Sequence, residues 1–231
     1  MKLFFILLLL SLNFSSLGKA IAANDKANEG PWSSYFQSQI NAQPHDLVTK
    51  AFDLIKTKRA LTIIDLGVGN GKDITKILKA GAVVYAYDAD PESINIINKR
   101  FNFYIRNNKL FTHQMFFEDI TALPTADMII SINSLPFMRK DKLLSFWKIV
   151  EDSLTPNGIF VGTFFGEKHY AKRNPKRPAL FRLNREELLT LFKSFQILYF
   201  HEDFEYDENS SKSWGTDQFD HRYKVIARKK G

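Results

Sequence analysis

Cysteine is absent from the 231-residue chain, which removes several kinds of chemistry at once. Disulfide bonds, thiolate metal sites, a cysteine nucleophile and a lipid-modified cysteine are all excluded. The sequence also lacks internal repeats and low-complexity tracts. Its length suits one sizeable α/β domain with a buried core and is too short for two comfortable ones.

Long hydrophobic runs are missing too, apart from one at the N-terminus. There Lys2 precedes the apolar stretch 3–10, which is shorter than the roughly 20 residues that a membrane-spanning helix needs. The Ala20-Ile21-Ala22 segment fits a cleavage site, so residues 1–22 are predicted to be a secretory signal peptide. An exported protein, periplasmic or secreted, with no membrane span in its mature chain is expected. The alternative is a membrane anchor formed by an uncleaved N-terminus.

Acidic residues are too few to balance the basic ones. The formal charge is +7 from 32 Lys and Arg against 25 Asp and Glu. Removing residues 1–22 takes away two lysines and no acid, which leaves 30 basic against 25 acidic residues, or +5. This excess permits an anionic partner without requiring one.

Beyond a flexible linker expected over residues 23–31, strand and helix patterns alternate in one domain, 32–231. The expected strands are 61–66, 83–88, 114–117, 128–133, 159–165, 197–201 and 223–228. The expected helices begin at residue 32 and cover 45–56, 73–79, 91–101, 140–154 and 185–192. The alternation predicts a Rossmann-like, doubly wound α/β fold with a mostly parallel seven-stranded sheet and an antiparallel C-terminal strand. The polar stretch 202–221 is expected to be a loop.

The turn after the first strand carries the strongest functional signal. Gly67, Gly69 and Gly71 follow an apolar strand and precede a helix, an arrangement that lets a ligand approach the backbone closely. Asp88 lies 21 residues after Gly67, where an acidic side chain can accept hydrogen bonds from both ribose hydroxyls of an adenosine. Lys72 occupies the place of the third glycine in the dinucleotide fingerprint, so a nicotinamide oxidoreductase is disfavoured.

The G-x-G-x-G turn, with Asp65 two residues before it, resembles the first motif of class I S-adenosylmethionine-dependent methyltransferases. Segments 85–94, 117–124, 126–135 and 154–160 resemble the family's later motifs in order, and the resemblance covers roughly residues 32–228. Within the superfamily, the segments 32–36, 183–188 and 224–229 are most similar to the tellurite-resistance (TehB-like) small-molecule type. Val68 stands where that type often has cysteine, and its histidine-rich approach to the last strand is only partly kept.

The resemblance implies roles for individual residues toward S-adenosylmethionine. The three glycines of the turn would admit its methionine and ribose parts. Asp65 would meet the ammonium group, Asp88 the ribose, Asp119 the adenine amino group and the Ile120 backbone N–H a ring nitrogen. Asn133 would lie beside the methionyl part near the methyl group. No metal ligand set is apparent.

Aromatic residues ahead of the first strand offer a further contact with the cofactor. Tyr35, more than Trp32, is placed to bring a ring face near the sulfonium through a cation–π contact. The alternative is that these rings only pack their helix onto the domain.

The catalytic residues stay unknown at this level. Methyl transfer depends mainly on alignment of donor and acceptor, and a base is needed only when the acceptor must lose a proton. The candidates for such a base are His113, His169 and His221, and the catalytic candidates overall are Asn133, His169 and His221. An ordinary surface or hydrogen-bonded role is the alternative for each histidine.

The basic segment 168–178 follows the fifth expected strand and would therefore lie on the ligand-binding edge. It contains Lys172, Arg173, Lys176 and Arg177, which suggest a lid that captures an anionic acceptor. A solvated basic loop is the alternative.

The expected function is transfer of a methyl group from S-adenosylmethionine to a small-molecule acceptor, with anions among the candidate acceptors. A nucleic-acid methyltransferase is a weaker alternative, because Asn133 begins Asn-Ser-Leu-Pro-Phe rather than an Asn-Pro-Pro-Tyr motif and no recognition module is appended. A non-catalytic S-adenosylmethionine-binding protein is the other alternative, since fold alone does not establish activity. The oligomeric state is not predicted.

Overall fold

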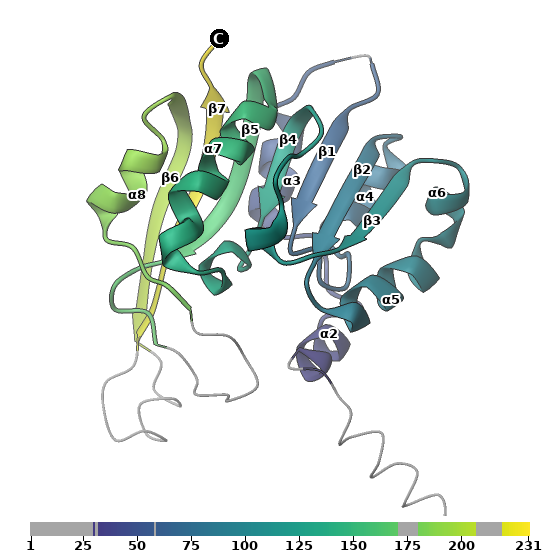
Figure 1. Ribbon diagram of the computed structural model, residues 1–231, viewed down its shortest axis with the longest axis horizontal. Helices are drawn as coiled ribbons and strands as arrows, with labels where there is room; N and C mark the ends of the chain where they lie inside the picture. The colour runs from purple at the N-terminus through teal and green to yellow at the C-terminus, as the bar shows by residue number, and fades with distance from the viewer. Residues whose placement is uncertain (1–29, 31, 58, 171–179, 207–218) are drawn as a thin grey trace, which may run out of the picture.

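The computed structural model describes residues 30, 32–57, 59–170, 180–206 and 219–231. Within this part of the chain, one seven-stranded sheet has the order β3-β2-β1-β4-β5-β7-β6 (Figure 1). The strands are β1 (Thr62–Leu66), β2 (Val83–Asp88), β3 (Leu110–Gln114), β4 (Ala126–Ser131), β5 (Leu154–Phe165), β6 (Phe195–Tyr206) and β7 (Phe219–Lys229).

Neighbouring strands from β3 to β5 pair in parallel, whereas β7 pairs antiparallel with both β5 and β6. The predicted fold class, a doubly wound sheet with an antiparallel C-terminal strand, is therefore confirmed. The helices are α2 (Ser33–Ser38), α3 (Asp46–Asp53), α4 (Ile74–Lys79), α5 (Pro91–Arg100), α6 (Asn102–Arg106), α7 (Leu143–Ser153) and α8 (Arg185–Leu191). Short 3-10 helices cover Phe117–Asp119, Leu135–Phe137 and Lys140–Lys142.

Two hydrophobic cores hold the helices on opposite faces of the sheet. Apolar side chains of α3, α4 and α5 pack on one face, and those of α7 and α8 pack on the other. β4 lies between the two layers, and all six of its residues are buried. A strand covered on both faces needs a nearly continuous apolar run, which explains the sequence Ala-Asp-Met-Ile-Ile-Ser.

Two sequence expectations were wrong in position. The third strand is Leu110–Gln114 rather than 114–117. This strand lies at the sheet edge, where only Leu110 of its five residues is buried, so its sequence lacks the apolar pattern that predicts a strand. The apolar residues that suggested a strand follow it instead, and Phe116 is 62% exposed. The expected loop 202–221 is also partly strand, since β6 continues to Tyr206 and β7 starts at Phe219.

No helix within the described ranges is long and apolar enough to cross a membrane.

Substitution of Trp147 on α7 tests the packing of the core that supports the sheet. Its indole N–H donates to the Leu191 carbonyl at 2.6 Å, and its side chain is buried among aromatic rings. Trp147→Phe is expected to lower the free energy of unfolding by about 1–3 kcal/mol, because the buried carbonyl loses its donor. Leu144→Ala on the same helix, at a side chain 70% exposed, is the matched control and should change it by less than about 0.5 kcal/mol. Urea unfolding followed by circular dichroism measures both, and equal effects would contradict this account of the core.

Candidate active site

The candidate site lies where the carboxyl ends of β1 and β4 meet. In the sheet, β2 and β3 lie on one side of β1, and β4 and β5 lie on the other side of β1 (Figure 1). Ligands of open α/β sheets bind beyond the strand ends at this reversal of strand order. Ser134, just after β4, donates its hydroxyl to the Leu66 carbonyl of β1 at 2.5 Å and so joins the two ends.

The glycine turn after β1 is held in a backbone conformation that favours glycine. Gly67, Gly69 and Gly71 have φ angles of +82°, +54° and +77°. A Cβ at Gly67 would lie 2.2 Å from the Ser134 Cβ, and one at Gly71 would lie 2.5 Å from a methyl group of Ile97. At Gly69 the nearest atom would be 3.6 Å away. Packing therefore requires two of these glycines, and the middle one leaves space beside the backbone.

Asp88 at the end of β2 is tied to this turn. One carboxylate oxygen accepts the Gly69 N–H at 2.9 Å, and the other accepts the Asp90 N–H at 2.9 Å. Burial raises the pKa of Asp88 even though these hydrogen bonds favour the charged form. The two bonds fix the carboxylate and leave each oxygen able to accept another hydrogen bond.

Asp65 on β1 is 3% exposed, and no group in the described residues donates a hydrogen bond to its carboxylate. Burial raises the pKa of Asp65 well above its usual range, and the charges of Asp73 and Asp88 raise it further. A buried carboxylate without a donor is costly unless a cation or a proton compensates it. This position therefore suits a positively charged ligand group.

The predicted adenine contacts lie after β3. Asp119 has an exposed side chain in the 3-10 helix Phe117–Asp119. Ile120 is buried, and its backbone N–H donates to the Phe117 carbonyl at 3.2 Å. A ring nitrogen of adenine would compete with that carbonyl for the Ile120 N–H, so these two contacts remain predictions.

Helix α2 lies against the glycine turn. The Asn70 side-chain amide donates to the Phe36 carbonyl at 3.2 Å, and the Lys72 ammonium donates to Gln39 at 3.1 Å. Tyr35 on the same helix is 39% exposed. The sequence expectation that the segment before β1 packs beside the ligand edge is consistent with these contacts.

At the end of β4, Asn133 has a φ angle of +53°, which few residues other than glycine and asparagine adopt readily. Its backbone N–H donates to the Thr163 hydroxyl at 2.7 Å, and its side-chain oxygen accepts from that hydroxyl at 2.9 Å. Arg222 on β7 also approaches this oxygen, at 3.5 Å. Asn133 is thus fixed next to Ser134, which bonds to the end of β1, and its place near the reacting groups stays a prediction.

The comparisons with known proteins agree with this geometry. Residues 64–160 match the family model of a methyltransferase domain. This match indicates a methyltransferase domain over residues 64–160. A search of curated proteins found no match.

Solved structures show the same fold. TehB from Haemophilus influenzae superposes with a TM-score of 0.67 at 21% identity, over 85% of this chain and 66% of that one. The 1,6-didemethyltoxoflavin-N1-methyltransferase of Burkholderia thailandensis gives 0.61 at 16% identity, over 94% and 90% of the two chains. A methyltransferase from Methanosarcina mazei gives 0.59 at 15% identity, over 81% and 99%. The predicted TehB-like methyltransferase fold is confirmed, although the chain spans just under two thirds of the TehB chain's length.

The residues of the methyltransferase domain fit the predicted cofactor. The carboxylate of Asp65, which accepts no hydrogen bond from the described part of the chain, suits the ammonium group of S-adenosylmethionine, and the fixed carboxylate of Asp88 suits its ribose hydroxyls. The open space at Gly69 lies between them in sequence. When bound, the sulfonium supplies an activated methyl group.

The histidine candidates are already engaged by the protein. The Lys168 N–H donates to Nδ1 of His221 at 3.3 Å, so Nε2 carries the proton and donates to Glu202 at 3.0 Å. His169 is buried, and its ring stacks on the Phe165 ring with 3.8 Å between the two ring centres. The geometry therefore offers no free ring nitrogen at His221 for a catalytic base.

His113 on β3 stacks on the Tyr87 ring at 4.6 Å, and burial lowers its pKa. Lys172, Arg173, Lys176 and Arg177 of the suggested lid lie outside the described residues. Sequence reasoning missed Thr163 and gave Ser134 no role, because a hydroxyl residue in an apolar strand or a loop gives no functional signal until its partners are known.

Within the described residues, no group of three His, Asp or Glu side chains is placed to hold a metal ion. The surface also has a hollow of about 430 Å³ on α6, lined by Asn102, Phe103, Arg106 and Asn107. Its lining carries no acidic or histidine side chain, so the strand ends remain the candidate active site.

The buried charge of Asp65 predicts a pH effect on stability without cofactor. Because its pKa is raised, the folded protein keeps the proton to a higher pH than the unfolded chain does, and the free energy of unfolding falls as pH rises through that interval. Asp65→Asn cannot ionise, so its stability relative to the wild type should increase with pH by up to about 1.4 kcal/mol per unit.

Urea unfolding of the cofactor-free protein between pH 4 and 8 measures this difference. Asp152→Asn is the matched control, because the Asp152 side chain is 60% exposed on α7. A constant difference between Asp65→Asn and the wild type across this range would show that Asp65 is not held at a raised pKa.

Proposed function

We propose that the protein transfers the methyl group of S-adenosylmethionine to a small-molecule acceptor. The observation that carries this proposal is the buried Asp65 carboxylate, which has no donor among the described residues, beside a glycine turn that is tied to Asp88. The three features together match the ammonium, main-chain and ribose contacts of one ligand. The B. thailandensis neighbour, solved with bound 1,6-didemethyltoxoflavin and S-adenosylhomocysteine, supports a small organic acceptor by analogy of fold.

The chemistry needs alignment more than acid–base assistance. The acceptor lone pair forms a bond to the methyl carbon while the carbon–sulfur electron pair leaves with the sulfur. Holding two reactants close and in line can contribute roughly 7–11 kcal/mol. With both nitrogens of His221 engaged, this chain suits an acceptor that is nucleophilic without losing a proton, such as an anion or a thiolate.

We further propose an anionic acceptor. Arg222 lies beside Asn133 and is about one-third exposed. Asp220 pairs with its Nε, which leaves guanidinium N–H groups for a ligand. The lysines and arginines of segment 171–179 follow the same sheet edge in sequence and would add positive charge.

Asp88 provides the test of cofactor binding. Asp88→Ala is expected to weaken binding of S-adenosylmethionine about 10–100-fold, because hydrogen bonds to a charged group contribute about 1.5–3 kcal/mol. Asp88→Asn keeps an oxygen that can accept the Gly69 N–H. Comparison of the two variants therefore distinguishes the loss of ribose contacts from a disturbed glycine turn. Calorimetry with S-adenosylmethionine, its demethylated product and NAD measures the effect. Unchanged affinity in Asp88→Ala, with Asp152→Ala as control, would remove the ribose assignment.

Activity requires a separate test, because a binding protein without transfer activity would pass the calorimetry. A radiolabelled methyl screen over small anions, thiols, amines and a nucleic-acid sample is expected to label a small anion or thiol. Labelling of nucleic acid alone would favour a nucleic-acid methyltransferase, and tight cofactor binding without any labelling would favour the non-catalytic alternative.

Export is the remaining part of the proposal and rests on residues 1–22, which lie outside the described residues. Expression of the full chain in a bacterial host should give a mature protein that begins at Ala23, as the Ala20-Ile21-Ala22 pattern predicts. Mass spectrometry of the periplasmic fraction measures the N-terminus. An intact Met1 in a membrane fraction would support the anchor, and an intact cytosolic chain would exclude both.

A further inference from the structure

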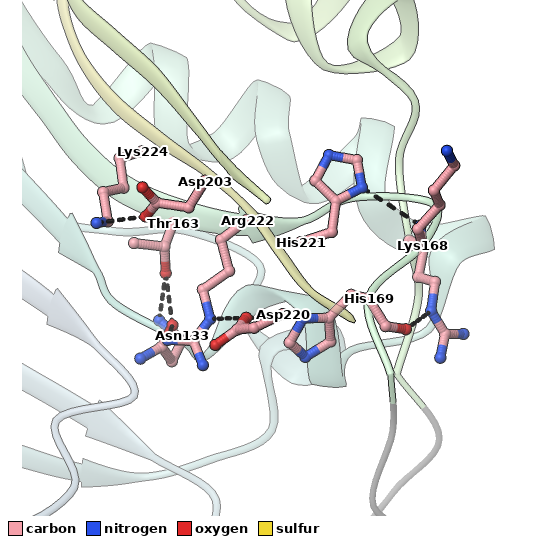
Figure 2. Close-up of polar contacts among 10 residues, drawn as sticks. Asn133, Thr163, Lys168, His169, Asp203, Asp220, His221, Arg222 and Lys224 are labelled. Atoms are coloured by element: carbon pink, nitrogen blue, oxygen red, sulfur yellow. Dashed lines mark hydrogen bonds and ion pairs between the residues drawn. The ribbon is translucent and has the colours of Figure 1, made fainter. Parts of the chain in front are cut away.

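The side chain of Asn133 is held in one orientation by two neighbouring strands. The Thr163 hydroxyl on β5 accepts the Asn133 backbone N–H and donates to the Asn133 side-chain oxygen, as the dashed lines in Figure 2 show. Thr163 is 1% exposed, so water does not compete for its hydroxyl. Arg222 reaches the same side-chain atom from β7.

The hydrogen-bond chemistry decides which end of the amide faces the sheet. The Thr163 hydroxyl accepts the Asn133 N–H, so its single hydrogen is free to be donated to the Asn133 side chain. Arg222 has only donors. The Asn133 side-chain atom that accepts hydrogen bonds from both the Thr163 hydroxyl and the Arg222 guanidinium must be the carbonyl oxygen. The NH₂ group therefore faces away from Thr163 and Arg222.

Arg222 is itself fixed. Its Nε donates to Asp220 at 2.6 Å, and its guanidinium carbon lies 5.8 Å from the centre of the Phe165 ring. Asp220 also lies 3.1 Å from Nδ1 of His169. Although burial alone would raise it, the neighbouring His169 and Arg222 lower the pKa of Asp220. Asp220 thus stays charged and holds the guanidinium in place.

The Asn133 NH₂ group has no acceptor among the described residues, and it lies at the strand end that adjoins the glycine turn. We propose that this NH₂ group donates to the methyl acceptor, and that Thr163 and Arg222 are positioning residues that keep the amide in this orientation. The inference rests on the proposed function, since it concerns the second substrate of the same site.

This orientation restricts the class of acceptor. A donor at Asn133 suits an acceptor with an oxygen lone pair next to the methylated atom, such as a carboxylate, a phenolate or a ring carbonyl. An amine would need the amide oxygen to receive its N–H, but that oxygen is occupied by Thr163 and Arg222.

Aromatic rings along the same edge indicate a ring-bearing acceptor. The rings of Trp32 and Phe137 are 4.7 Å apart, and those of Phe137 and Phe165 are 6.0 Å apart. Phe165 is buried, whereas Trp32 and Phe137 are partly exposed. Benzoate and benzylamine are therefore suitable probes, because they share a ring and present an oxygen acceptor or an amine.

The test uses the full chain saturated with S-adenosylhomocysteine. The Asn133 side-chain amide resonance is assigned by its loss in Asn133→Asp. Benzoate is expected to shift this resonance, and benzylamine is expected to leave it unchanged. Thr163→Val should weaken benzoate binding at least tenfold with affinity for S-adenosylhomocysteine within twofold, while Thr163→Ser, which keeps the hydroxyl, should bind benzoate like the wild type.

Asn133→Asp keeps the test valid if Thr163→Val fails to fold, because a carboxylate cannot donate and should also lose benzoate binding. A shift caused by benzylamine, no shift with benzoate, or unchanged benzoate binding in Asn133→Asp would overturn the inference. Failure of the protein to bind S-adenosylhomocysteine would instead overturn the proposed function, so the two failures are distinguishable.

Discussion

The close contact between Gly67 and Ser134 is the constraint on which the rest of the site depends. A Cβ at Gly67 would lie 2.2 Å from the Ser134 Cβ, so only glycine lets the loop after β4 pack on the turn after β1. The Ser134 hydroxyl then bonds to the Leu66 carbonyl and lies 2.7 Å from the Ser131 hydroxyl. These contacts bring together the turn that is proposed to contact the cofactor and the asparagine that follows β4.

Electrostatics at this edge favour a ligand that brings positive charge and hydroxyl groups. Asp65, Asp73 and Asp88 all have pKa values raised first by burial. Asp73 accepts the His45 N–H and Asp88 accepts two backbone N–H groups, whereas Asp65 has no donor in the described residues. Without a ligand, burying the Asp65 carboxylate costs the folded protein free energy of desolvation, and a bound ammonium group offsets this cost.

The proposed acceptor side differs, because its polar side chains bond to one another and leave the Asn133 NH₂ group without an acceptor among the described residues. A continuous set of contacts runs from Thr163 through Asn133, Arg222 and Asp220 to His169, and it joins β4, β5 and β7 (Figure 2). Such a network orients the side chains of Asn133 and Arg222, because each hydrogen bond limits where the next group can lie. Selection between acceptors then depends on which hydrogen-bonding group is presented.

The amino-acid sequence by itself determined the fold class, the glycine turn and the position of Asp88, because these depend on local periodicity and on spacing along the chain. It misplaced β3, whose edge position removes the burial that usually marks a strand, and it could not foresee how far β6 and β7 extend. Only the tertiary structure decided that Asp65 has no donor in the part of the chain that is described, that His221 is engaged on both nitrogens, and that Thr163 orients Asn133. The physical reason is that hydrogen-bond satisfaction depends on neighbours from distant strands, which no local sequence pattern records.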